Sequence, residues 1–352
     1  MRVCFLLLEP QWDGRARAFR EAGVALRERG YEVTLACARG SDTARVCRGF
    51  GDDVIEIVVR GGWLGDAWRL RPVLRSRFVE VIFAHGERAQ LVAAAAARLA
   101  ARGAVVRRLP PRGQLTLGAD ARLANRLAAT GFLFTDAHDL RAARPPARAL
   151  EPVVAPVAAP AVVEPPAGGG PSITCVYDDT TRGALSLALR AIGALVPRHP
   201  DLRAILAGPP GDDDAIRIQC AALGIGHAVA LVHEPAARAV AIAGARAVWL
   251  LADGDDFAYA ALDAFAAGVP VIALRSPLAA RFVSDDVNGL GLGAADPALA
   301  ASLLARLIAD APLRERLGAG ARASLGRFPR EGMADGFARA AAAARDRTRW
   351  RT

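Results

Sequence analysis

Residues 245–273 read ARAVWLLADGDDFAYAALDAFAAGVPVIA, and this stretch decides the fold class. A short apolar run, residues 247–251, stops at an acidic turn that contains glycine, and an alanine-rich helical segment follows. Residues 268–270 (Gly-Val-Pro) then lead into a second apolar run, residues 271–273. Strand, loop, helix and strand in this order form the crossover unit of a parallel sheet. We therefore expect the acidic loop at the carboxyl end of a strand, where open α/β sheets bind their ligands.

The same alternation of apolar strands and helices occurs on both sides of a single interruption. That interruption, residues 151–171, is rich in proline and glycine and predicts a linker. We expect two doubly wound α/β domains, residues 1–150 and 172–329, and a helical segment over residues 330–352. Two domains also suit the length of the chain, 352 residues.

Arginine dominates the charged composition. The chain has 45 basic residues and no lysine, against 36 acidic residues, which gives a net charge of +9. A GC-rich genome is one explanation, and the charge also suits anionic partners such as nucleotide diphosphates or acidic lipids. No zinc-ligand spacing or RNA-binding signature accompanies it, so we expect no nucleic-acid partner and no metal. No Gly-x-Gly-x-x-Gly follows the first strand, which argues against a nicotinamide or flavin cofactor.

Cysteines and hydropathy indicate the compartment. Cys4, Cys37 and Cys175 lie in apolar runs, where a thiol acts as a small core hydrophobe. This usage favours a reducing environment, so we expect a cytoplasmic protein. No uninterrupted apolar stretch approaches the ~18 residues that a membrane span requires.

Residues 60–77 interleave basic and aromatic side chains. Trp63 and Trp68 alternate with arginines, a pattern typical of a helix that lies on an anionic bilayer. An amphipathic helix packed on the sheet would show a similar pattern. Peripheral contact with the inner face of a membrane is therefore one of two open interpretations.

Two acidic residues frame the loop and helix of the decisive stretch. Asp255 and Asp263 are eight residues apart, about two helical turns, so a helix would carry both carboxylates on one side. Residues 255–258 (DDFA) and 263–272 (DAFAAGVPVI) resemble a phrase of family 4 glycosyltransferases of the GT-B fold. The usual wording there is Glu-Gly-Phe-Gly, then Glu-Ala-Met-Ala-x-Gly-x-Pro-Val-Ile. Both glutamates of the family are aspartates here.

The resemblance implies a fold and a reaction. The fold is two Rossmann-like, doubly wound α/β domains that face a cleft, the GT-B architecture, with residues 330–352 crossing back to the first domain. The reaction is hexosyl transfer from a nucleotide-sugar donor to a hydroxyl of a glycan, lipid or small-molecule acceptor, with retention and without cofactor or metal. Two alternatives stay open: a GT-B protein that has lost catalysis and acts as a binding or assembly partner, and a nucleotide-sugar epimerase.

The resemblance also assigns roles to donor-site residues. Asp255 matches the acidic position near the donor sugar, and Asp263 matches the one that hydrogen-bonds the nucleotide ribose. Arg182 replaces a lysine that contacts the donor diphosphate, and Phe257 belongs to the donor-binding phrase. Each charged residue also has an explanation without a ligand. Asp255 could cap the helix, and Asp263 and Arg182 could be ordinary surface residues.

Other positions depart from the family or lie elsewhere in the chain. Asp178 occupies the place of a companion arginine, and its charge is wrong for a phosphate. In the loop of residues 274–281 the family has a Gly-Gly pair and a glutamate, and those positions are Pro277, Leu278 and Arg281 here. The side-chain charge of Arg275 and Arg281 would replace the backbone contacts to the diphosphate. His85, after the fourth strand, matches a family histidine near sugar and acceptor, where neutral imidazole could share the acceptor proton. A structural histidine is the alternative. The remaining histidines show no comparable partner set: His138, His199, His227 and His233.

Overall fold

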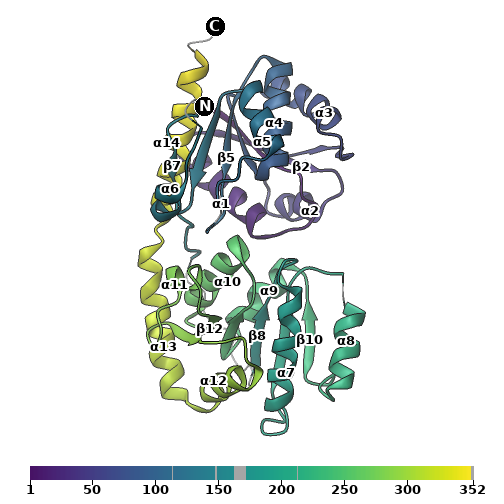
Figure 1. Ribbon diagram of the computed structural model, residues 1–352, viewed down its shortest axis with the longest axis vertical. Coiled ribbons are helices and arrows are strands. Elements are labelled where there is room, and N and C mark those ends of the chain that lie inside the picture. The colour runs from purple at the N-terminus through teal and green to yellow at the C-terminus, as the bar shows by residue number, and fades with distance from the viewer. Residues whose placement is uncertain (113, 147–148, 162–171, 212, 350–352) are drawn as a thin grey trace. The chain divides into compact units, whose positions relative to one another are not determined.

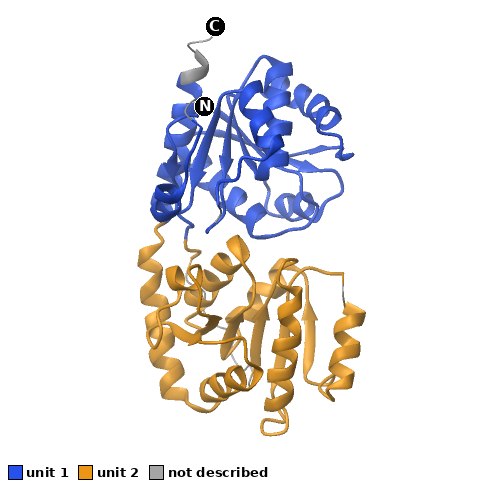
Figure 2. Cartoon of the chain, viewed as in Figure 1, with its two compact units in different colours: residues 1–158, 330–352 blue, residues 159–329 orange. Residues whose placement is uncertain are grey.

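A computed structural model describes most of the chain, namely residues 1–112, 114–146, 149–161, 172–211 and 213–349. The chain divides into two compact units, Met1–Ala158 with Arg330–Thr352, and Ala159–Pro329 (Figure 2). Each unit is a parallel sheet covered by helices (Figure 1). Among the helices described, none is both long enough and apolar enough to cross a membrane.

The described part of the first unit contains a seven-stranded parallel sheet in the order β3-β2-β1-β4-β5-β6-β7. Its strands are β1 (Arg2–Leu7), β2 (Glu32–Ala38), β3 (Val54–Ile57), β4 (Val81–His85), β5 (Ala104–Arg108), β6 (Thr130–Phe134) and β7 (Val153–Val154). Its helices are α1 (Gly14–Glu28), α2 (Asp42–Gly49), α3 (Trp63–Ser76), α4 (Gly86–Ala100), α5 (Ala119–Leu127), α6 (Ala137–Ala142) and α14 (Arg330–Arg349).

Central strands of this sheet are buried on both faces. Successive side chains of a strand point to opposite faces of the sheet, and helices cover both of them. Phe5 and Phe83 stack with ring centroids 5.0 Å apart. Both belong to the core formed with Phe19 of α1 and Phe337 of α14. Ile82 faces the other layer, which α3, α4 and α5 form. Strands buried in this way read as continuous apolar runs, which is what the sequence shows.

The structure differs from the sequence prediction at the start of the predicted linker, residues 151–171. Val153–Val154 form β7 and pair with β6, and Ala155 is buried in the core that contains Phe5 and Phe83. Gly336 of α14 permits this packing, since a Cβ there would lie 2.4 Å from the Ala155 Cβ. Proline-rich composition predicted a linker because proline cannot donate to a sheet, but a two-residue edge strand tolerates proline nearby. Residues 162–171 of the predicted linker lie outside the described residues.

The described part of the second unit contains a six-stranded parallel sheet in the order β10-β9-β8-β11-β12-β13. Its strands are β8 (Ser172–Val176), β9 (Arg203–Ala207), β10 (Val229–Val232), β11 (Ala247–Leu250), β12 (Val271–Leu274) and β13 (Gly289–Leu292). Its helices are η1 (Arg182–Ala184), α7 (Leu185–Leu195), α8 (Asp213–Ala222), α9 (Pro235–Ala243), α10 (Gly254–Ala267), α11 (Ala279–Phe282), α12 (Pro297–Ala309), α13 (Ala311–Ser324) and η2 (Leu325–Arg327).

Strand order reverses beside the first strand of each sheet. The reversal lies between β1 and β4 in the first sheet and between β8 and β11 in the second. Loops that leave such a pair of strands diverge, and the crevice at their carboxyl ends is the usual ligand site of open α/β sheets. The predicted class of two Rossmann-like, doubly wound α/β domains is confirmed.

Candidate functional site

The loop after β8 is organised by one carboxylate, Asp178. Its Oδ1 accepts hydrogen bonds from the N–H groups of Thr180 (2.7 Å) and Thr181 (3.0 Å), and from the Thr180 hydroxyl (2.6 Å). Its Oδ2 accepts from the Asp253 N–H (2.5 Å), in the loop after β11. Asp178 therefore joins the two loops that meet at the switch point of the second sheet. Its negative charge, which departs from the family pattern, is balanced by these donors.

Arg182 connects the loop after β8 to a third loop, the one that follows β9. It begins η1, and its Nη2 lies 2.7 Å from a carboxylate oxygen of Asp179 and donates to the Pro210 carbonyl (2.9 Å) after β9. The Asp179 side chain is 60% exposed, and ion pairs of that kind contribute only about 0–1 kcal/mol. A diphosphate, which a guanidinium can bind through two parallel hydrogen bonds, would compete well for Arg182.

Asp255 and Asp263 both lie on α10, the helix that starts at the switch point. Asp253 is the N-cap residue and accepts from the Gly254 N–H (2.9 Å), so capping does not explain Asp255. Asp255 lies in the first turn and is only 3% exposed, whereas Asp263 is half-buried two turns later. An acidic first turn is stabilised by the positive end of the helix dipole.

Phe257 is part of the core of the second unit. It is 4% exposed, and its ring is tilted against Phe282 of α11 with centroids 5.9 Å apart. Phe282 in turn stacks on Phe328 at 5.2 Å. The structure thus gives Phe257 a packing role, which anchors the first turn of α10 to α11.

Arg275 and Arg281 lie on either side of the loop after β12. Arg275 contacts Asp285 (2.5 Å), which also accepts from the Gly291 N–H (2.8 Å). These bonds, that of Gly291 first, hold the pKa of Asp285 below its usual value. Arg281 is half-buried in α11, and its carbonyl accepts from Arg327 (2.6 Å). Only Arg275 directly follows the carboxyl end of a strand.

His85 ends β4 in the first unit, beside the switch point of that sheet. It is 2% exposed and stacks on Phe19, with ring centroids 3.9 Å apart. Within the described chain neither ring nitrogen has a hydrogen bond of normal geometry, although the backbone of Arg15 and of Arg108 lies close. Burial, and then the charges of Arg108 and Arg15, hold the pKa of His85 well below its usual value. The imidazole is therefore neutral at neutral pH.

His233 belongs to the same edge of the second sheet, and the sequence analysis gave it no role. It follows β10, with Nδ1 2.8 Å from the Gly208 carbonyl and Nε2 3.0 Å from the Asp213 carboxylate. Its position directly after an apolar run, like that of His85, was the available signal. Over the described ranges, no group of three or more His, Cys, Asp or Glu side chains is placed to hold a metal ion.

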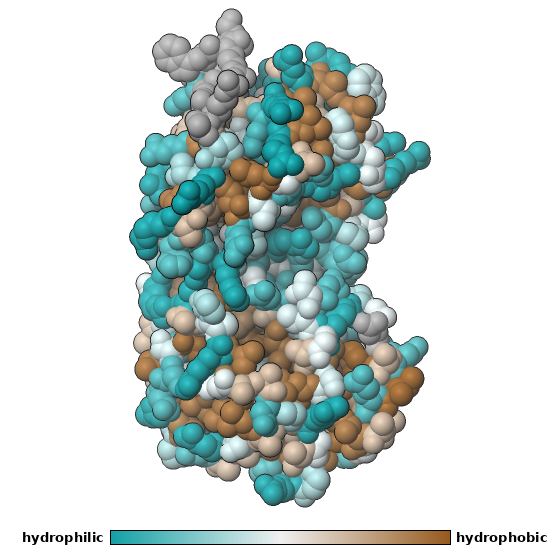
Figure 3. All heavy atoms as spheres, in the orientation of Figure 1, coloured by the Kyte–Doolittle hydropathy of each residue, from teal (hydrophilic) through white to brown (hydrophobic). Residues whose placement is uncertain are grey.

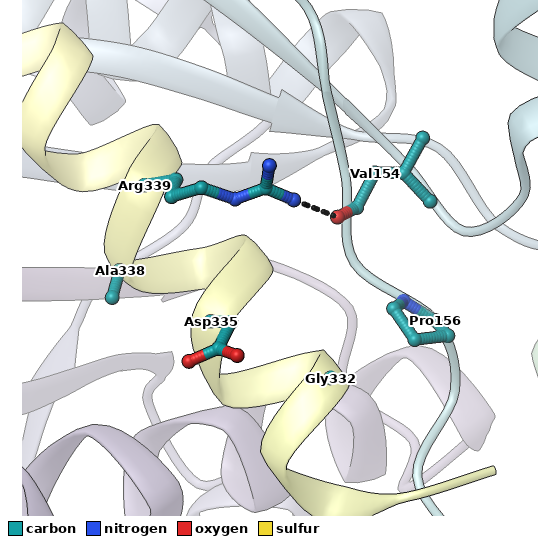
Figure 4. A pocket seen from close by; sticks show the side chains of 6 residues that line it. All are labelled: Val154, Pro156, Gly332, Asp335, Ala338 and Arg339. Carbon is teal, nitrogen blue, oxygen red and sulfur yellow. Dashed lines mark hydrogen bonds between the residues drawn. The ribbon is translucent and has the colours of Figure 1, made fainter.

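A cavity of about 590 Å³ lies in the first unit between α14 and the segment after β7 (Figure 4). Arg339 donates to the Val154 carbonyl (3.3 Å), and Asp335 pairs with Arg29 (2.7 Å). Both charged groups of the lining therefore have protein partners. The cavity contains none of the predicted site residues. It is lined by Val154, Pro156, Gly332, Asp335, Ala338 and Arg339.

Comparison with known proteins connects this geometry to a family. Residues 167–324 match the sequence profile of the family described as "Glycosyl transferases group 1", and this range covers most of the second unit. An Anabaena protein, Alr3699/HepE, solved in complex with UDP and glucose, superposes with a TM-score of 0.74 at 16% identity. The superposition covers 96% of this chain and 98% of that one. The superposition shows a shared fold, and the profile match places the similarity to group 1 glycosyltransferases on the second unit.

Two curated relatives match shorter segments. The D-inositol 3-phosphate glycosyltransferase of Xylanimonas cellulosilytica is 39% identical over 101 residues, 28% of this chain and 24% of that protein. The protein of the same name from Acidothermus cellulolyticus is 31% identical over 162 residues, 43% of this chain and 36% of that protein. This chain therefore spans only about a quarter to a third of the curated relatives' length.

Proposed function

We propose that the protein transfers a hexosyl group from a nucleotide-sugar donor to an acceptor hydroxyl, with retention of configuration. One observation carries the proposal: the group 1 glycosyltransferase match falls on the unit whose switch point carries Arg182 and Asp255. The acceptor is a glycan, a lipid or a small molecule.

The donor diphosphate is the proposed ligand of Arg182. The guanidinium exchanges an exposed carboxylate, Asp179, for phosphate oxygens, and it keeps the Pro210 carbonyl as an anchor. Phosphate carries more charge than a carboxylate and offers several acceptor oxygens, so the exchange is favourable. Arg275 supplies a second cation at the end of β12, where Asp285 is its present partner. Arg281, on α11, is the third proposed donor contact.

Asp255 and Asp263 are the proposed partners of the sugar and the ribose. Asp263, two turns along α10, accepts from the ribose hydroxyls, for which a carboxylate supplies paired acceptors. Asp255, in the first turn, accepts from sugar hydroxyls and stabilises positive charge that develops at the anomeric carbon. Phe257 supports both indirectly, because its packing on Phe282 fixes the start of α10.

His85 is the proposed catalytic group of the first unit. A neutral imidazole can hydrogen-bond an attacking hydroxyl and orient it, and the lowered pKa of His85 keeps the ring neutral across the physiological range. Its stacking on Phe19 fixes the plane of the ring.

Titration calorimetry followed by turnover tests the proposal. UDP and UDP-glucose are the first probes, because the Anabaena neighbour was solved with UDP and glucose. We expect heat on titration and slow release of glucose without an acceptor. Asp255→Asn should lower turnover by roughly 100-fold while changing UDP affinity by less than about two-fold. Proton NMR of the first-formed product reports whether the anomeric configuration is retained.

The matched control is Asp286→Asn. Asp286 is an exposed aspartate of the same unit with a positive φ of 58°, a conformation that asparagine adopts as easily. This variant should keep wild-type turnover. The proposal fails if uridine, guanosine and adenosine diphosphates and their sugars give neither heat nor turnover. A binding or assembly partner without catalysis would then be the better description.

A further inference from the structure

Helix α3 of the first unit presents an apolar ridge to solvent. Leu64 and Trp68 are 57% and 60% exposed, and Pro72, four residues on, is also exposed. Residues four apart lie on one side of a helix, so these side chains form one continuous ridge. The opposite side of α3, with Leu70 and Leu74, is fully buried in the core shared with α4. The ridge therefore adds nothing to that core.

Positive charge surrounds the ridge. Residues 58–79 contain five arginines and a single acidic residue, Asp66. The Asp66 side chain is buried beneath the helix, where it accepts from the Arg60 N–H (2.9 Å) and lies 3.4 Å from Arg69 and 3.2 Å from Arg88. No carboxylate of this segment thus reaches the outer surface, and the face around the ridge is cationic.

Guanidinium groups lie against the exposed rings. Arg71 sits over Trp68 at 5.1 Å and donates to the Leu99 carbonyl (3.1 Å), which fixes its position. Arg2 and Arg102 lie 5.3 and 5.0 Å from the ring of Phe78, two residues beyond α3. In Figure 3, apolar and hydrophilic atoms adjoin over the region where Figure 1 labels α3 and α4. Aromatic rings beside cations suit the headgroup layer of a bilayer, where rings meet acyl chains and guanidinium groups meet phosphates.

We propose that the outer face of α3 docks on an anionic lipid bilayer, with Leu64 and Trp68 inserted below the headgroups. The ridge protrudes from a helix, which suits insertion into a fluid layer, and the surrounding charge has the sign that anionic lipids attract. An acidic protein partner would share the charge argument, but exposed tryptophan and leucine on a basic helix are typical of an interfacial helix. This proposal does not depend on the proposed transferase activity.

Co-sedimentation of the full chain with extruded vesicles tests it. One set of vesicles is pure phosphatidylcholine, and the other contains roughly a third phosphatidylglycerol. The wild-type protein should sediment strongly with the anionic vesicles and only weakly with the neutral ones. Raising the salt to about 0.5 M should weaken binding without abolishing it, because screening leaves the apolar insertion.

Two double variants separate insertion from charge. Leu64→Ser with Trp68→Ser should abolish sedimentation at high salt. Arg60→Glu with Arg75→Glu should lower vesicle affinity at low salt by at least about 25-fold, since each arginine near an anionic surface contributes about five-fold.

Two double variants of the second unit serve as controls. They match the α3 variants in the exposure of the side chains and in the change of net charge. Ile218→Ser with Val240→Ser removes two apolar side chains that are 69% and 61% exposed. Arg217→Glu with Arg316→Glu makes the same change in net charge at side chains 65% and 57% exposed. Both controls should bind vesicles like the wild type.

Brominated acyl chains provide a readout of depth. They quench tryptophan within the bilayer, so wild-type fluorescence should fall on vesicle binding and Trp68→Phe should lose that change. The proposal is overturned if the wild-type protein does not sediment with anionic vesicles. It is equally overturned if the control doubles lose as much binding as the α3 doubles, because the attraction would then follow net charge rather than this face.

Discussion

Asp178 and Arg182 are four residues apart in one loop, and their partners differ in kind. Asp178 accepts from backbone N–H groups, including that of Asp253, whose positions the fold fixes. The carboxylate partner of Arg182 is Asp179, an exposed side chain that can turn away into water. Asp178 is therefore a structural residue of this loop, while Arg182 is the group that a ligand can recruit.

Arg182→Ala should weaken UDP binding by about 10–100-fold, the range expected for losing charge-assisted hydrogen bonds. Arg182→Lys should recover part of that loss, because it restores the charge without the two-pronged geometry. Calorimetry measures both. Arg217→Ala, which removes an arginine from an exposed ion pair with Asp214, serves as the control. Equal affinities of the Arg182→Ala and Arg217→Ala proteins would remove Arg182 from the donor site.

His85 makes the stability of the first unit depend on pH. The unfolded residue has a pKa of about 6.5, and burial lowers the pKa of the folded one well below that. As the pH falls below about 6.5 the unfolded chain binds a proton that the folded chain does not, so acidification destabilises the fold. The limiting slope is about 1.4 kcal/mol per pH unit, and above about pH 7.5 it vanishes.

Urea unfolding at about pH 7.5 and about pH 5.5 measures this slope. His85→Gln should flatten the dependence, since glutamine does not titrate. His138→Gln, at an exposed histidine of the same unit, should leave it unchanged. A slope that survives in the His85→Gln protein would mean that other groups cause it.

At the scale of elements, α10 is positioned at both ends. Asp253 caps its start, and Gly268 ends it in the left-handed conformation with φ 68°. Gly318 of α13 passes so close that a Cβ there would lie 2.3 Å from the Gly268 carbonyl oxygen. That oxygen belongs to the backbone and cannot move aside easily, so α10 and α13 pack this closely because residue 318 is glycine.

Gly318→Ala should destabilise the second unit by roughly 1–3 kcal/mol, the usual cost of overpacking. Gly193→Ala is the matched variant, because Gly193 also lies within a helix but a Cβ there would approach no closer than 4.0 Å to Ile225. It should stabilise by up to about 1 kcal/mol through helix propensity. Thermal unfolding of both proteins decides between propensity and close packing, and a stabilised Gly318→Ala protein would contradict this account.

Local periodicity predicted the parallel strands and α10, because apolar runs and helical spacing are properties of neighbouring residues. It did not predict β7, whose two residues are too few to show a period. Nor could it find the partners of Asp178, because Asp253 is distant in sequence and meets it only at the switch point. Three acidic residues, Asp253, Asp255 and Asp256, lie at the start of α10 and could each cap it. Only the structure could identify Asp253 as the cap.

At the scale of the whole molecule, the two units have similar topologies, but the evidence for a function differs between them. Each sheet reverses its strand order beside its first strand. The group 1 profile covers most of the second unit, whereas the proposed role of His85 in the first rests on a resemblance and on its neutral, buried ring. Nucleotide binding should therefore stabilise the second unit first.

Hydrogen exchange with and without UDP tests this order. At about 100 times Kd the ligand adds about 2.7 kcal/mol to the stability of whatever it binds. Exchange should slow most in the loop after β8 and in the first turn of α10, where Asp178 joins the two backbones. The carboxyl ends of β4 and β5 should keep their exchange rates while no acceptor is present. Protection confined to β4 and β5 would instead place the nucleotide on the first sheet and overturn the assignment of the donor to Arg182.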